Sequence, residues 1–95
     1  MHIITKKRIR EFSAQHPDAK MPLTIWYHLL SKTTVGSFAE LKALFRSVDQ
    51  VGTLAVFNIG GNKYRLIAAV HYNRKIVYIR HILTHAEYDR NKWRA

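Results

Sequence analysis

The sequence predicts one α+β domain over residues 1–95, with N-terminal helices packed on one face of a small antiparallel sheet and a short C-terminal helix. Apolar residues recur at helical spacing in the first half, whereas from Thr53 onward Val, Ile, Tyr and Phe gather in short runs separated by turn sequences. The chain has only four glycines and two prolines and no internal repeat, so neither disorder nor a solenoid is expected. Its length suits one core and excludes a second domain.

Helices are expected to fill most of the first half of the chain. The apolar start at residues 1–4 is compatible with a short strand, and Thr5 is the expected N-cap of a first helix that ends at Pro17. A second helix is expected over residues 19–31. Its buried face should hold Ile25, Trp26, Leu29 and Leu30. Residues 37–40, Ser-Phe-Ala-Glu, have the form of a capping box and predict a short third helix.

The second half predicts a three-stranded antiparallel meander followed by a final helix. The strands are expected at residues 54–59, 63–72 and 75–83, joined by tight turns at Gly60-Gly61-Asn62 and Asn73-Arg74. Residues 84–87, Thr-His-Ala-Glu, have the form of a second capping box and open the last helix. Glu87 is therefore expected to cap this helix rather than to act as a base.

The net charge points to an anionic partner. Sixteen Lys and Arg against six Asp and Glu give a formal charge of +10, which attracts polyanions such as nucleic acid or an acidic protein. The absence of cysteine excludes disulfides, thiolate zinc sites and cysteine nucleophiles, and no His pair has metal-site spacing, so we expect no metal and no other cofactor. No apolar run is long enough to span a bilayer and no signal segment is evident, so a cytoplasmic protein without a membrane partner is expected.

The tight turn between the last two strands sets their expected register. The predicted partners are Leu66 with His81, Ile67 with Arg80, Ala68 with Ile79 and Val70 with Val77. Arg65, Tyr78 and Arg80 then lie on the face opposite the apolar one, joined by Asn58, while His81 points toward the core. Arg65 and Arg80 become diagonal neighbours with no evident carboxylate, an arrangement suited to bidentate binding of phosphate. Ordinary solvated arginines on an exposed sheet face are the open alternative.

His85 and Tyr88 are candidates for the chemistry because they begin the last helix where a strand has just ended. The positive helix terminus and nearby basic groups are expected to disfavour the imidazolium form of His85, so that its ring can accept a proton. Tyr88, one turn further on, is placed to stack on a base or to bond a phosphate. Simpler interpretations stay open: His85 as a solvent-exposed first-turn residue, and Tyr88 packing against Trp93 or the sheet.

Three motifs occur in order along the second half: VFNIGGNKYRL at residues 56–66, VYIR at 77–80 and THAEYD at 84–89. Together they resemble the signature of HigB-type toxins of the RelE-like superfamily. The resemblance extends upstream through His16-Pro17 and residues 37–42, so it covers nearly the whole chain. It implies a RelE-like fold, ribosome-dependent cleavage of messenger RNA, and neutralisation by a HigA-type helix-turn-helix antitoxin. The toxin is then expected to associate with operator DNA only indirectly, through this antitoxin.

The resemblance includes the positions of six candidate residues, Asn58, Asn62, Arg65, Arg80, His85 and Tyr88, whereas Lys63 is less constrained in the family. The hypothesis is a metal-independent cleavage in which a 2′-hydroxyl attacks the adjacent phosphodiester and leaves a 2′,3′-cyclic phosphate. The expected catalytic residues are Arg65, Arg80, His85 and Tyr88, and the expected RNA contacts are Asn58, Asn62, Lys63 and Tyr78. Two other hypotheses stay open: a non-enzymatic basic module that binds RNA or the ribosome, and a basic face that only receives acidic residues of the antitoxin.

Overall fold

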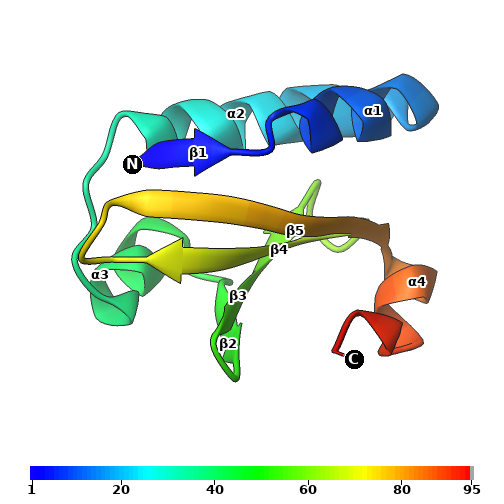
Figure 1. Cartoon of the computed structure of the whole chain (residues 1–95). Helices are drawn as coiled ribbons and strands as arrows, with labels where there is room; N and C mark the ends of the chain where they lie inside the picture. Colours follow the sequence, from blue (N-terminus) through cyan, green and yellow to red (C-terminus); the bar gives the residue numbers. More distant parts are fainter. Residues whose placement is uncertain (95) are drawn as a thin grey trace.

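The computed structural model describes residues 1–94, with side chains for residues 1–93, and places one mixed sheet between two layers of unequal size (Figure 1). Its helices are α1 (Lys7–Gln15), α2 (Lys20–Ser31), α3 (Phe38–Leu44) and α4 (His85–Asp89), with short 3₁₀ turns at Pro17–Ala19 and Lys92–Arg94. Its strands are β1 (His2–Ile4), β2 (Asp49–Val51), β3 (Leu54–Ile59), β4 (Tyr64–His71) and β5 (Ile76–Thr84). None of the described helices is both long and apolar enough to span a membrane.

The sheet is wider than the expected meander. The meander itself, β3 to β5, is confirmed, but the full order is β1-β5-β4-β3-β2, which makes five strands rather than three. The N-terminal strand β1 pairs in parallel with β5, and β2 adds to β3 as an antiparallel edge strand. Gly52 in the turn between β2 and β3 has a φ of +62°, a conformation that glycine adopts without strain. The extra strands are only three residues long, too short to show a period in the sequence.

Most of the core lies between the sheet and helices α1 to α3. On α2 the buried side chains are Leu23, Trp26 and Leu30, whose i, i+3, i+7 spacing places them on one side of the helix. The prediction for Trp26 and Leu30 is confirmed, but that for Ile25 and Leu29 is wrong, because these two side chains are 59% and 39% exposed. At about 100° per residue they lie more than a quarter-turn away from the centre of the buried stripe.

The helix starts match the expected caps in part. Thr5 is not the N-cap of α1: Lys6 occupies that position without a side-chain hydrogen bond, and Thr5 has a φ of 75°. Ser37 does cap α3, since its Oγ accepts a hydrogen bond from the backbone N–H of Glu40 at 3.3 Å. The Glu40 carboxylate reaches one residue further back than a capping box requires and accepts from the N–H of Gly36 at 3.2 Å.

The opposite face of the sheet is covered in part by the C-terminal segment. Val56, Ile67 and Trp93 are buried there and form a second, smaller apolar cluster, against which Leu83 and Tyr88 pack. Figure 1 shows α1 and α2 on one side of the sheet and α4, with the turn after it, on the other. The N-terminal helices thus lie on one face, as the sequence predicted, whereas α4 lies on the face that was expected to stay partly free, so this second face is open only beside the C-terminal segment.

The predicted register of β4 and β5 holds for only half of their length. Ala68 pairs with Ile79 as expected, but Ile67 pairs with His81, so Arg80 is an extra residue in β5 without a partner on β4. The later predicted pairs are wrong by one position, the observed ones being Ile67 with His81, Leu66 with Ile82 and Arg65 with Leu83. A β-bulge of this kind moves every following side chain to the other face of the sheet. His81 consequently lies on the face of Arg65 and not toward the main core.

Candidate active site

Arg65 lies at the centre of the polar surface beside the second cluster. On the sheet it pairs with Asn58 of β3 and Leu83 of β5, so these three side chains share one face. Its guanidinium donates to the carbonyl oxygens of Asn62 and Tyr64 at 3.3 and 3.2 Å, and to Asn62 Oδ1 at 3.3 Å. No carboxylate of residues 1–93 lies within ion-pair distance of it. The loop before β4 thus orients a guanidinium whose charge has no acidic partner.

Tyr88 lies under this guanidinium. The Arg65 Cζ atom is 5.4 Å from the centre of the Tyr88 ring, within the range of a cation–π contact. The Tyr88 ring also stacks on Trp93, with centroids 5.1 Å apart and planes 14° from parallel. Trp93 is only 6% exposed, and its Nε1 donates to the backbone oxygen of Tyr88 at 3.0 Å. The interpretation that Tyr88 packs against Trp93 is confirmed, and the same packing holds Tyr88 against Arg65.

A complete capping box fixes the start of α4. Thr84 N donates to Glu87 Oε1 at 2.9 Å, and Glu87 N donates to Thr84 Oγ1 at 3.2 Å. These hydrogen bonds, led by the one from the Thr84 backbone, hold the pKa of the Glu87 carboxyl below its ordinary value. The expectation that Glu87 serves the cap is confirmed. The backbone N–H of His85 also donates to the oxygen of Lys63 at 3.1 Å, which ties α4 to the turn before β4.

His85 has a carboxylate partner that the sequence reasoning did not assign. Its Nδ1 lies 2.9 Å from Oδ2 of Asp89, one turn along α4, and both side chains are at least half exposed. The prediction that basic groups dominate the surroundings of His85 therefore overlooked the nearest charge. This contact occupies the Nδ1 side of the ring, so Nε2 is the nitrogen available to exchange a proton with a ligand. Spacing by four positions on a helix was the signal available in the sequence.

The expected convergence of Arg65 and Arg80 does not follow from the observed register. Arg80 is exposed at the bulge. Arg65 pairs with Leu83, which lies three residues after Arg80 on β5 and therefore roughly 10 Å away from it. His81, predicted to point to the core, instead lies on the Arg65 face. Burial lowers the pKa of His81, and the positive charges of Arg8 and Arg80 lower it further. The sequence signal was two adjacent polar residues that break the alternation of the strand.

Two of the expected RNA contacts lie away from Arg65. Lys63 Nζ forms an ion pair with Asp18 Oδ2 at 3.4 Å, beside the Tyr64 hydroxyl, which donates to Asp18 Oδ1 at 2.6 Å. Because Asp18 belongs to the helical layer, Lys63 is drawn toward that layer. Tyr78 shares the face of Arg65, but it pairs with Ala69, which lies roughly 13 Å from Arg65 along β4. There its ring contacts the His71 ring edge-on, with ring centroids 5.2 Å apart. Only Asn58 and Asn62 are brought to Arg65.

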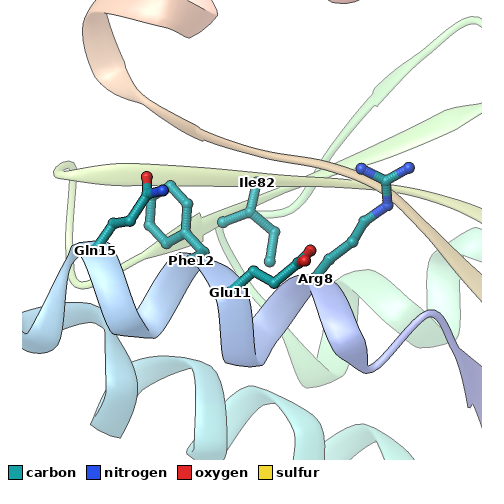
Figure 2. Close-up of a pocket in the computed structure, with 5 residues that line it drawn as sticks. All are labelled: Arg8, Glu11, Phe12, Gln15 and Ile82. Carbon is teal, nitrogen blue, oxygen red and sulfur yellow. The ribbon is translucent and has the colours of Figure 1, made fainter.

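Two hollows flank the end of β5. One, of about 230 Å³, adjoins the Tyr88–Trp93 stack and is lined by His81, Leu83, Glu87, Arg90, Lys92 and Trp93. The other, of about 180 Å³, lies on the helical side, and Figure 2 shows Arg8 and Glu11 extending from α1 toward β5 beside Ile82. The first contains the cations Arg90 and Lys92, the imidazole of His81 and one acid that is engaged in the cap, so it suits an anionic ligand. No predicted site residue lines the second.

Comparison with known proteins identifies the family. Residues 19–91 match the model of the HigB toxins, described as the RelE-like toxic component of a toxin-antitoxin system. The chain belongs to the HigB toxin family. It is 36% identical over 92 residues to the mRNA interferase toxin HigB of Escherichia coli K12, and this alignment covers 94% of this chain and 88% of the relative. The identity and both coverages are the same for the mRNA interferase HigB of Shigella flexneri. It is 30% identical over 93 residues to the mRNA interferase HigB of E. coli O6:H1, covering 95% and 90%.

The predicted resemblance to HigB-type toxins is thus confirmed. All eight predicted site residues of this HigB-family chain fall within the matched segment. Trp93, which stacks on Tyr88, lies just beyond the segment, and so does Lys92 of the adjoining hollow. Sequence reasoning missed Trp93 as a site component because a buried aromatic near a chain end carries no motif, although its position five residues after Tyr88 made a local contact possible.

Proposed function

We propose that this chain is a toxin of a toxin-antitoxin system that acts as an mRNA interferase, an endoribonuclease that cleaves translated messenger RNA in the cytoplasm. The observation that carries the proposal is the Arg65 guanidinium, held over the Tyr88 ring by the Asn62 loop without an acidic partner. The names of the relatives supply the substrate class, since they are mRNA interferases. We further propose that the ribosome helps to complete the site and that a HigA-type antitoxin neutralises the toxin.

The proposed reaction takes its nucleophile from the RNA. The 2′-oxygen forms a bond to the adjacent phosphorus, the bond from phosphorus to the 5′-oxygen breaks, and a 2′,3′-cyclic phosphate remains. One proton must leave the 2′-hydroxyl and another must reach the departing 5′-oxygen. Negative charge builds on the non-bridging oxygens meanwhile. Arg65 is the group proposed to stabilise it, because a guanidinium offers paired donors that match two phosphate oxygens.

His85 is proposed to move the protons. With Nδ1 beside the Asp89 carboxylate, the Nε2 atom is the proton acceptor for the 2′-hydroxyl or, when protonated, the donor to the leaving oxygen. Asp89 acts as a positioning residue, since it orients the ring without touching the RNA. Tyr88 is proposed to stack on a base or to bond the phosphate next to Arg65.

The remaining predicted residues are proposed as RNA contacts. Asn58 and Asn62 lie beside Arg65 and offer amides to the nucleotides that flank the cut. Arg80, Lys63 and Tyr78 lie further away, so we propose that they contact flanking RNA and not the scissile phosphate.

Primer extension on a translated message tests the proposal. The wild-type chain should produce discrete cuts with 2′,3′-cyclic phosphate ends. Arg65→Ala should reduce cleavage on the order of 100-fold or more, because one essential electrostatic group contributes about 3–4 kcal/mol. Arg74→Ala replaces an exposed arginine in the turn after β4; it is the matched control and should cut normally.

Normal cleavage by Arg65→Ala would remove Arg65 from the site. Binding of RNA without cleavage by the wild type would favour the non-enzymatic hypothesis. Rapid cutting of naked RNA would contradict ribosome dependence.

The two histidines on this side of the molecule are separated by a second experiment. His85→Gln should lose about 100-fold or more in cleavage rate, the contribution typical of a general acid or base. Asp89→Asn should lose less and should displace the pH–rate profile, which a purely structural role would not do. His81→Gln is the control and should retain the wild-type profile. Loss of activity in His81→Gln together with retention in His85→Gln would assign the proton transfer to His81 instead.

A further inference from the structure

A basic groove runs along the outer face of the helical layer, between α1 and α2. It comprises two adjoining hollows of about 380 and 180 Å³, which share Lys6, Ile9 and Thr24. Its cations are Lys6, Arg10 and Lys20, and none of the described residues that line it is acidic. Lys6 lies over the Tyr27 ring at 4.7 Å, so its charge is held at the groove and not extended into solvent. Three like charges without a counter-ion favour an acidic ligand.

An apolar row on α2 continues this surface. Met21, Ile25 and Leu29 are 69%, 59% and 39% exposed, and they are the only large apolar side chains of the described residues with such exposure. Their spacing of four positions aligns them along the helix. Thr24 and His28 lie between this row and the groove, both lining the smaller hollow. The groove and the apolar row therefore form one continuous surface, which we call the α1–α2 face.

The chemistry of the α1–α2 face selects a protein partner over RNA. Phosphates would satisfy the three cations, but the apolar row offers nothing to a ribose-phosphate backbone. A protein segment that is acidic on one side and apolar on the other satisfies both parts. The family to which the chain belongs is the toxic component of a toxin-antitoxin system, so its members have an antitoxin as a partner, and the HigA-type antitoxin proposed above is a protein.

We infer that the antitoxin docks on the α1–α2 face through an acidic, amphipathic segment. Its apolar side chains cover Met21, Ile25 and Leu29, and its carboxylates meet Arg10 and Lys20. Figure 1 shows that α1 and α2 lie on the opposite side of the sheet from α4, so this contact is separate from Arg65 and Tyr88. The inference rests on family membership and not on the proposed RNA cleavage.

Binding measurements with the purified cognate antitoxin test the inference. Arg10→Glu combined with Lys20→Glu should weaken binding on the order of 10- to 100-fold, because it places like charges against the acidic segment. Ile25→Asp should weaken it by a similar factor through the apolar row. Arg74→Glu combined with Lys75→Glu changes the net charge equally in the exposed turn after β4, and it should bind as the wild type does. Unchanged affinity in both groove and row variants would overturn the inference, as would equal weakening by the control.

Oxidation of methionine gives an independent measurement on the unmodified chain. Met21 is 69% exposed and should be converted to the sulfoxide readily by dilute peroxide when the toxin is free. Bound antitoxin should slow this conversion at least tenfold, while Met1, the only other methionine, provides the internal reference. An unchanged rate at Met21 in the complex would overturn the inference, whatever the result of any cleavage assay.

Discussion

Removal of the Trp93 side chain measures how far the second apolar cluster stabilises the fold and the site. Trp93 is 6% exposed, packs with Val56 and Ile67, and stacks on Tyr88. A buried tryptophan covers about 150–250 Å², which at ~25 cal/mol per Å² corresponds to about 4–6 kcal/mol as an upper bound. We therefore expect Trp93→Ala to lose about 3 kcal/mol, the lower end for such truncations.

Urea unfolding provides the measurement, and Trp93→Phe provides the matched variant. Phenylalanine keeps an aromatic ring beside Tyr88 but lacks the Nε1 donor, so it should lose only about 1 kcal/mol. Trp26, the only other tryptophan, then reports on the main core by fluorescence in both variants. Cleavage should fall further in Trp93→Ala than in Trp93→Phe, because Tyr88 loses its support. If all three proteins unfold within about 0.5 kcal/mol of one another, the reasoning about the second cluster is refuted.

Three further predictions concern the scaffold. Leu23→Ala, in the main core, should lower the free energy of unfolding by about 2–5 kcal/mol. Leu29→Ala on the same helix should change it by less than about 0.5 kcal/mol. Equal losses of the two variants in urea titrations would contradict the assignment of the buried face. Thr84→Ala should destabilise α4 by about 1 kcal/mol, seen as faster amide exchange confined to that helix. The Tyr64 hydroxyl lowers the pKa of Asp18, so this carboxylate stabilises the fold above its ordinary pKa and the contribution disappears as the pH falls through the lowered value. In Tyr64→Phe the pKa of Asp18 should rise toward its ordinary value in an NMR titration, and an unchanged value would exclude the hydrogen bond as its main cause.

The parts of the fold that were predictable are those with a long, regular pattern. The helix at α2 and the meander β3 to β5 each extend over enough residues for a helical or strand period to appear. The face of α2 was harder to predict, because two apolar rows overlap on it and only contact with the sheet decides that Leu23, and not Ile25, is buried. The edge strand β2 has no such pattern, since its pairing depends on β3 and a glycine turn.

The sequence named candidate site residues, but it did not determine how they are arranged. Motif positions indicated Arg65, His85 and Tyr88, and the capping box placed the last two on a helix. The partner of His85 and the support of Tyr88 depend on how α4 and the following turn fold back, which no strand register determines. The position of Arg80 was predicted wrongly because a bulge leaves only a faint trace in the alternation of polar and apolar residues.

The single unpaired residue at Arg80 decides on which face of the sheet the end of β5 presents its side chains. Replacing Arg80 alters one exposed side chain. Excising it would restore an uninterrupted ladder with the same pairs, Ile67 with His81 and Arg65 with Leu83, so Leu83 would keep its face. The strand is thus expected to absorb the loss of this one residue. One additional residue between His81 and Leu83 would instead invert Leu83 and separate the segment that carries Tyr88 from the smaller cluster.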